Sequence, residues 1–163
     1  MNHSKRNVAI AVVLLVILLL IPFWPKLKSA VHPAGGSDTG PMVSCTMEIT
    51  CPQVLDYMDE LKPETAAAIP KKGIFLPKTE LEVPEGSSLL DVLQLVGQQQ
   101  KLSVEVSGSP AYVVGIGGLR AGDATDMAGW TYTVNGESIM VGCSEQKVEE
   151  GDQIAWTYLC TWE

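Results

Sequence analysis

The sequence predicts an α+β fold in which a mixed β-sheet packs on one main helix. Three observations support this prediction: a strict apolar–polar alternation over residues 130–134, a capped amphipathic helix that starts after Ser88, and further short strands on both sides of that helix. A separate apolar stretch over residues 8–24 precedes the folded part and predicts a single transmembrane helix.

Residues 8–24 form the most apolar stretch of the chain. They contain no charged residue and consist mainly of Val, Ile, Leu and Ala. A helix of this length spans about 25 Å, near the lower limit for a bilayer core of about 30 Å. We expect an uncleaved signal-anchor with residues 1–7 in the cytoplasm. A cleaved signal peptide is the alternative, although Lys28 precedes Ser29 and Ala30 and fits a cleavage site badly.

Residues 25–42 are rich in Pro, Gly and Ser and predict a flexible linker. The folded domain is expected over residues 43–163, a length that suits one hydrophobic core. The expected localisation is the plasma membrane, single-pass, with the folded domain extracellular. If the N-terminal segment is cleaved, the protein is expected to be secreted.

The folded part is strongly acidic. The whole chain has a formal net charge of −8, and residues 43–163 hold seven basic and eighteen acidic residues, a net charge of −11. Binding to nucleic acid needs Lys and Arg at the phosphates, so we expect no nucleic-acid partner.

All four cysteines lie in the predicted extracellular domain, at Cys45, Cys51, Cys143 and Cys160. An even number beyond an export signal predicts two disulfides. Cys143 and Cys160 flank the last predicted hairpin and are the favoured pair, which leaves Cys45 with Cys51 across a turn near Pro52. Cys45–Cys143 together with Cys51–Cys160 remains open.

The elements before the main helix are short. Apolar and polar side chains alternate over residues 45–50 as in a strand, and the apolar residues after Pro52 have helical spacing. Residues 63–68 predict one more helical turn, and residues 79–83 predict a second strand.

The main helix is the clearest element. Ser88 and Asp91 have the spacing of a capping box, and the helix is expected to run to about residue 100. Strands are then predicted over residues 101–106 and 111–116, followed by a glycine-rich loop to residue 129. The apolar stripe of the helix consists of Leu89, Val92, Leu93 and Val96.

The C-terminal part predicts a hairpin and a last strand. Asn135-Gly136 is a strong turn signal, because both positions tolerate positive φ. Residues 139–141 are the expected return strand. Four aromatic side chains should then share one face of neighbouring strands: Trp130, Tyr132, Trp156 and Tyr158.

No catalytic residue is expected. Nucleophilic catalysis by a Ser-His or Cys-His pair needs a histidine in the domain, and the two histidines are His3 and His32. Carboxylates such as Asp123 and Asp126 lie in polar loops and indicate solvated turns rather than acid–base pairs or calcium ligands. We therefore expect no metal site and no required cofactor.

Five segments, in order, resemble the transcobalamin-like C-terminal domain family. They span residues 83–93, 112–119, 129–136, 142–144 and 151–158. The resemblance implies a β-grasp-like domain, similar to the smaller of the two domains that sandwich cobalamin in transcobalamin and intrinsic factor. The helical barrel that supplies the other half of that sandwich has no counterpart in this sequence.

The resemblance implies a non-enzymatic extracytoplasmic binding module for cobalamin or a similar bulky soluble ligand. The alternative is a cell-surface protein-interaction or spacer domain without a small-molecule ligand. The expected partners are a small molecule or a second surface protein, and the membrane through residues 8–24. The expected ligand-binding residues are Gly117, Gly118, Leu119, Trp130 and Tyr132.

Overall fold

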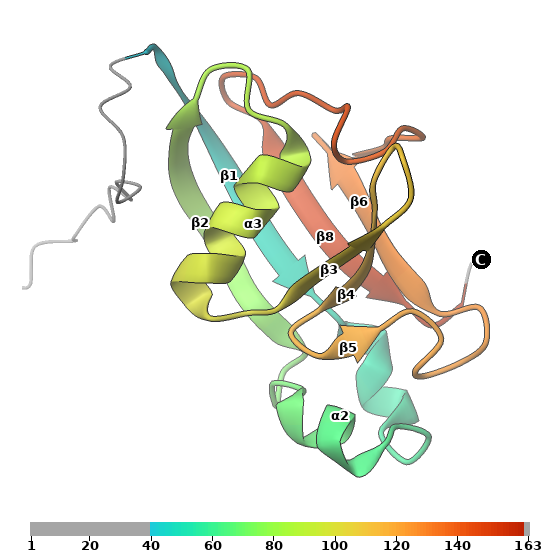
Figure 1. Ribbon diagram of the computed structural model, residues 1–163. Coiled ribbons are helices and arrows are strands. Elements are labelled where there is room, and N and C mark those ends of the chain that lie inside the picture. The colour runs from blue at the N-terminus through green and yellow to red at the C-terminus, as the bar shows by residue number, and fades with distance from the viewer. Residues whose placement is uncertain (1–39, 162–163) are drawn as a thin grey trace, which may run out of the picture. The chain divides into compact units, whose positions relative to one another are not determined.

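A five-stranded sheet with the order β2-β1-β8-β6-β7 forms one layer of the computed structural model, which describes residues 40–161 (Figure 1). Strand β1 (Met42–Thr50) pairs in parallel with β8 (Gln153–Leu159) at the centre. The other neighbours pair antiparallel, so the predicted mixed sheet is confirmed. These strands are β2 (Ile74–Pro84), β6 (Gly129–Val134) and β7 (Glu137–Ser138).

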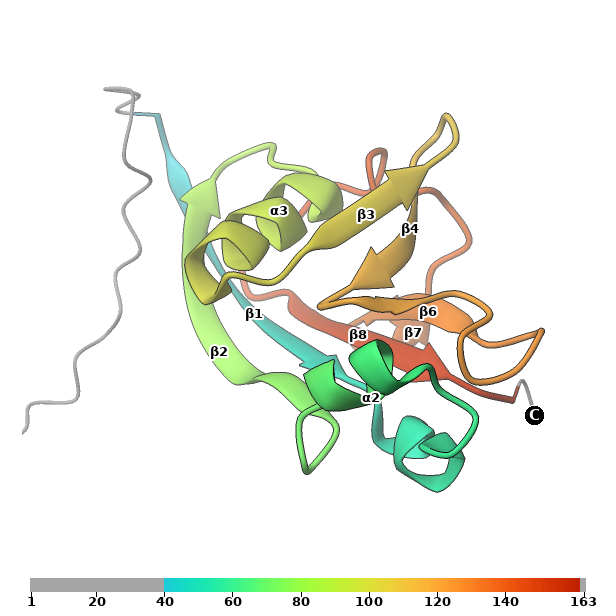
Figure 2. The ribbon, with the colours of Figure 1, turned by 60° about the horizontal axis from the view of Figure 1, so that its bottom comes forward.

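Helix α3 (Leu89–Gln100) and a second, three-stranded sheet cover one face of the larger sheet (Figure 2). The small sheet has the order β3-β4-β5 and pairs antiparallel throughout. Its strands are β3 (Val104–Ser107), β4 (Tyr112–Ile116) and the two-residue β5 (Leu119–Arg120). Strand β5 was not predicted, because it lies inside the predicted glycine-rich loop and two residues are too few to show an alternating pattern.

The ends of α3 follow from its sequence. The Ser88 hydroxyl accepts the Asp91 N–H at 3.2 Å, and the Asp91 carboxylate accepts the Ser88 N–H at 2.8 Å, so the predicted capping box is confirmed. Lys101 caps the other end in the left-handed conformation with φ 56°. The strand predicted from residue 101 therefore starts only at Val104, because left-handed backbone cannot continue into a strand.

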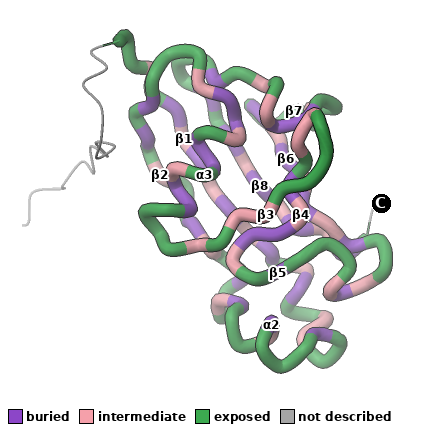
Figure 3. Tube along the Cα trace, viewed as in Figure 1, coloured by how far each residue is buried: buried purple, intermediate pink, exposed green. Residues whose placement is uncertain are grey.

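The core lies between the larger sheet and the elements that cover it. Side chains alternate along β1, β6 and β8, so every second residue is buried and its neighbours are only partly covered (Figure 3). The largest fully buried side chains join the two layers. They include Met47 and Ile49 of β1, the α3 stripe of Leu89, Val92, Leu93 and Val96, and Trp156 and Tyr158 of β8.

Strand β2 and the predicted return strand differ most from the sequence prediction. Strand β2 begins at Ile74 rather than at residue 79, and it contains Pro77. Proline has no N–H for a sheet ladder, but β2 is an edge strand and tolerates it. The return strand predicted over residues 139–141 is wrong: the hairpin after β6 is closed by β7.

The segment between β1 and β2 is helical, as predicted. It contains a 3-10 helix, η1 (Pro52–Tyr57), and a short α-helix, α2 (Pro63–Ala68), and each begins with proline at its first turn. The predicted membrane helix over residues 8–24 and nearly all of the predicted linker lie outside the described residues. Within residues 40–161, no helix is long and apolar enough to cross a membrane.

Candidate functional site

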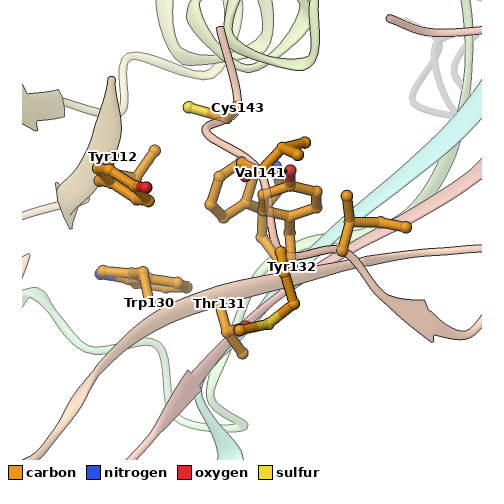
Figure 4. Close-up of a pocket in the computed structure, with 10 residues that line it drawn as sticks. Tyr112, Trp130, Thr131, Tyr132, Val141 and Cys143 are labelled. Atoms are coloured by element: carbon orange, nitrogen blue, oxygen red, sulfur yellow. Dashed lines mark hydrogen bonds between the residues drawn. The ribbon is translucent and has the colours of Figure 1, made fainter. Parts of the chain in front are cut away.

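A half-open cavity of about 210 Å³ lies between β4, β6 and the segment that follows β7 (Figure 4). In the view of Figure 4, Tyr112 and Trp130 lie on one side, and Tyr132 and Val141 lie on the other. The residues that line the cavity are Tyr112, Val113, Trp130, Thr131, Tyr132, Ile139, Met140, Val141, Cys143 and Trp156.

Strands β6 and β8 supply the aromatic wall. Tyr132 and Trp156 are direct partners in the antiparallel ladder, and their ring centroids lie 5.0 Å apart at 45°. Trp130 lies two residues before Tyr132 and so shares its face of the sheet. The alternation in the sequence is therefore what places these rings at one site.

Residues 139–143 close the other side of the cavity without forming a helix or strand. Hydrogen bonds to the sheet and to α3 hold this segment. The Tyr132 hydroxyl donates to the Val141 carbonyl at 2.7 Å, and the Leu90 N–H of α3 donates to the Cys143 carbonyl at 3.0 Å. The segment is thus tied to both the sheet and the main helix.

The buried titratable side chains at the cavity are neutral at physiological pH. Burial, followed by nearby Cys143 and Tyr112, raises the pKa of Tyr132 to about 12. Burial also raises the pKa of the Cys143 thiol, whose Sγ–H donates to the Ala111 carbonyl at 3.2 Å. Because no Asp, Glu, Lys or Arg lines the cavity, it suits an uncharged group.

The mouth of the cavity carries exposed apolar side chains. Met140 is 94% exposed, Tyr112 is 57% exposed and Val141 is 42% exposed. Single exposed apolar residues are common on protein surfaces, but a group of them beside an aromatic cavity indicates a contact surface.

The structure separates the five predicted ligand-binding residues into two groups. Trp130 and Tyr132 line the cavity, whereas the glycines do not. Gly117 has φ 61°, and a Cβ built on it would lie 2.5 Å from the Phe75 ring. Glycine at this position is therefore required by the close packing of Phe75.

Gly118 and Leu119 also lie outside the cavity. The Gly118 N–H donates to the Ser103 hydroxyl at 3.1 Å, and Leu119 is fully buried. The Leu119 carbonyl accepts the Trp130 indole N–H at 2.9 Å. Leu119 thus positions the Trp130 ring through this hydrogen bond, and ligand contact by Trp130 and Tyr132 stays a prediction.

Sequence reasoning missed most of the other lining residues. Trp156 was predicted to lie on a strand neighbouring that of Tyr132, and the structure makes the two direct partners. Residues 139–141 were expected to form a strand, so their place at the cavity could not be inferred. Gly142 is a weak sequence signal that this segment packs closely against another part of the chain. A Cβ there would lie 2.6 Å from Pro110, and only glycine allows this approach.

The predicted disulfides are not formed, and Cys45, Cys51, Cys143 and Cys160 are buried free thiols. Cys45 and Cys51 are separated by extended chain of about 20 Å at about 3.3 Å per residue, whereas a disulfide needs Cα atoms within about 7 Å. Cys143 contacts Ala111, while Cys160 lies near Cys51. Burial, followed by Cys160, raises the pKa of Cys51 to about 12.

The loop carboxylates serve the fold: Asp123 closes a local turn, and Glu150 joins its loop to strand β1. The Asp123 carboxylate accepts the Arg120 N–H at 2.7 Å, and the Glu150 carboxylate accepts the Ser44 N–H at 2.7 Å. In the part of the chain that the structure describes, no three His, Cys, Asp or Glu side chains gather as metal ligands would.

Comparisons with known proteins identify a related family profile and a related fold. Residues 86–159 match the profile of a family described as a domain of unknown function (DUF4430). No curated protein matches the sequence. Haptocorrin, whose crystal structure was determined in complex with Cbi, is similar with a TM-score of 0.53 and 16% identity.

The match with haptocorrin covers 77% of this chain and 27% of the haptocorrin chain, so this chain spans about a quarter of that protein. A candidate metal-binding protein from Ruminococcus gnavus ATCC 29149 matches over 74% of this chain and 99% of its own, with 13% identity and a TM-score of 0.46. The likeness to haptocorrin shows that this chain adopts a transcobalamin-like fold.

Proposed function

We propose that this domain is a non-enzymatic binding module that holds one uncharged group of a bulky ligand in the aromatic cavity. One observation carries this proposal: the cavity is bordered by a group of exposed apolar residues, Tyr112, Met140 and Val141. Covering these side chains with an apolar ligand would remove their surface from water and so favour binding.

The size of the cavity limits what enters it. Pockets for whole drug-sized molecules have volumes of about 300–1,000 Å³, and this cavity has about 210 Å³. A larger ligand would therefore insert one ring or side arm and lie across the mouth, against Tyr112 and Met140.

A corrinoid is the first ligand to test, because the fold resembles haptocorrin, which was crystallised with Cbi. A corrinoid is too large for the cavity and would be covered by this domain on one face only. Affinity rises with the share of the ligand that is buried, so we expect binding that is weaker than full enclosure would give.

Calorimetric titration of the full chain with cobinamide tests this function. We expect saturable binding, which the Met140→Ser substitution should weaken several-fold because Met140 borders the mouth. Met127→Ser is the matched control, since Met127 is 72% exposed and does not line the cavity. No saturable binding at millimolar cobinamide would contradict the corrinoid assignment.

A second candidate function is a surface protein-interaction domain without a small-molecule ligand. The small volume of the cavity favours it, because about 210 Å³ also suits one anchoring side chain of a protein partner. If cobinamide fails to bind, while Met140→Ser still abolishes capture of a partner that wild-type protein enriches, this second function would be supported.

We also propose that the domain is displayed outside the cell on a membrane anchor, or secreted if the N-terminal segment is cleaved. The apolar run over residues 8–24 and the Pro- and Gly-containing stretch after it support this placement. Protease added to intact cells should remove the domain, and full protection from protease would argue against the placement.

A further inference from the structure

The indole N–H of Trp156 has no hydrogen-bond partner, although it is buried. Trp156 is 2% exposed, and its Nε1 is the one buried side-chain nitrogen or oxygen without a partner in residues 40–161. Leaving a buried donor unpaired is costly, and native structures rarely do so without a reason.

The other buried aromatic residues with polar tips are all paired. Trp130 Nε1 donates to the Leu119 carbonyl at 2.9 Å, and the Tyr158 hydroxyl donates to the Arg120 carbonyl at 2.7 Å. Tyr132 donates to Val141. The fold can therefore supply carbonyl acceptors to rings on this face, and Trp156 stands apart from its neighbours.

The position of Trp156 indicates where a partner can come from. Ile49 is its partner on β1 and Tyr132 is its partner on β6, so packed strands flank it on both sides. Trp156 also lines the cavity. The described residues place no acceptor within reach of Nε1, and the atom itself is closed to water-sized molecules, although other atoms of Trp156 line the cavity. A ligand in the cavity therefore reaches Nε1 only when a neighbouring side chain moves aside.

We infer that the ligand of this cavity presents a neutral hydrogen-bond acceptor, such as a carbonyl oxygen on an apolar or aromatic framework, to the Trp156 indole N–H. This inference rests on the proposed binding function and adds the ligand chemistry. Indole can only donate, so the matching atom must accept, and the uncharged walls favour a ketone or amide over a carboxylate.

Trp156 is then a specificity-determining residue. A buried donor that is satisfied only by the right ligand rejects an analogue of equal shape that lacks the acceptor. The Trp130 indole N–H already has a partner and cannot discriminate in this way.

A matched pair of small probes tests the inference on the full chain. Acetophenone carries a carbonyl, and α-methylstyrene replaces its oxygen by a methylene group of similar size. We expect acetophenone to bind about ten-fold more tightly. In ¹⁵N-labelled protein, the Trp156 indole proton should shift downfield with acetophenone only, while the Trp130 indole proton, which is bonded to the Leu119 carbonyl, should respond to both probes alike.

Matched substitutions complete the test. Trp156→Phe should remove the preference for acetophenone. Trp130→Phe changes the cavity wall for both probes alike, so their absolute affinities should change together while the preference stays, because the N–H deleted there serves Leu119. If Trp156→Phe does not fold, the shift of the indole resonances in the wild-type protein is by itself the test of the inference.

If acetophenone and α-methylstyrene bind with equal affinity and neither shifts the Trp156 indole resonance, the acceptor inference is overturned. The proposed binding function would remain in place. Binding of cobinamide without binding of either small probe would likewise overturn the inference alone. If neither the probes nor cobinamide bind, the binding function falls together with the inference.

Discussion

Strands β6 and β8 carry two aromatic pairs on the same face, Trp130 opposite Tyr158 and Tyr132 opposite Trp156. The pairs use the same two amino acids and have similar ring separations, 5.3 Å and 5.0 Å. They differ in their polar atoms. In the first pair, the Trp130 indole N–H and the Tyr158 hydroxyl are both hydrogen-bonded. In the second pair, the Trp156 indole N–H has no partner.

The difference comes from the chain that lies over each pair. Trp130 and Tyr158 donate to the carbonyls of Leu119 and Arg120, which together form β5. Tyr132 and Trp156 lie beside residues 139–143 instead, and the cavity left there is also lined by Trp130. An aromatic ladder thus fixes a strand at one end and provides a candidate ligand site at the other.

Trp156→Ala should have the largest effect on stability. The side chain is 2% exposed, and its removal leaves a large cavity in the core, so we expect a loss of about 3–5 kcal/mol in the free energy of unfolding. Chemical denaturation measures this loss. A change below about 1 kcal/mol would show that Trp156 is not part of the core.

Gly117→Ala should cause the next largest loss in unfolding free energy, because it disturbs the packing behind the Trp130–Tyr158 pair. The new Cβ would meet the Phe75 ring, which itself contacts Trp130 at a centroid distance of 6.2 Å. Overpacking adds about 1–3 kcal/mol to the strain of positive φ. Gly122→Ala is the control, since Gly122 also has positive φ but no atom within 4 Å of its Cβ.

Equal losses in unfolding free energy for the two glycine variants would show that Phe75 moves aside at no cost. The claim that close packing of Gly117 against Phe75 supports Trp130 would then be wrong.

Trp130→Phe should destabilise the domain by about 1 kcal/mol more than Trp156→Phe. Both changes remove the same atoms, but only the first takes a donor away from a protein carbonyl. Denaturation of the two variants side by side measures the difference. A larger loss for Trp156→Phe would mean that its N–H has a partner in the free protein.

Stability should fall as pH rises from about 9 to about 12. Burial raises the pKa of Cys45 to about 11 and those of Cys51, Tyr132 and Tyr158 to about 12, above the ordinary values of 9.0 and 10.0. The unfolded chain therefore loses these protons at lower pH than the folded chain, and deprotonation favours unfolding.

Thermal melting across this range checks the linkage. The melting temperature should be lower at about pH 11 than at about pH 8, and a melting temperature that rises between these two values would contradict the burial of the four groups.

The fold was largely predictable because its elements have local patterns. The alternation of residues 130–134, the Ser88–Asp91 capping box and the Asn135-Gly136 turn all appear in the structure. Strand β2 was underestimated because Pro77 interrupts its pattern, and only its position at the sheet edge explains that proline.

The candidate site was only partly predictable. Trp130 and Tyr132 follow from the alternation, but the cavity exists because residues 139–143 approach Pro110 and α3 through long-range contacts. Those contacts leave no periodic signal in the sequence. Gly117 and Gly118 show the opposite error, since their conformation serves packing and a turn rather than a ligand.

The difference between the two aromatic pairs can be tested directly with cobinamide and ¹⁵N-labelled full-length protein. If the Tyr132–Trp156 pair forms the binding site, the indole N–H resonance of Trp156 should shift in a saturable manner and further than that of Trp130, which also lines the cavity but whose N–H is bonded to the Leu119 carbonyl. A saturable shift of Trp130 alone, or no shift of either resonance at millimolar cobinamide, would contradict the assignment of the site.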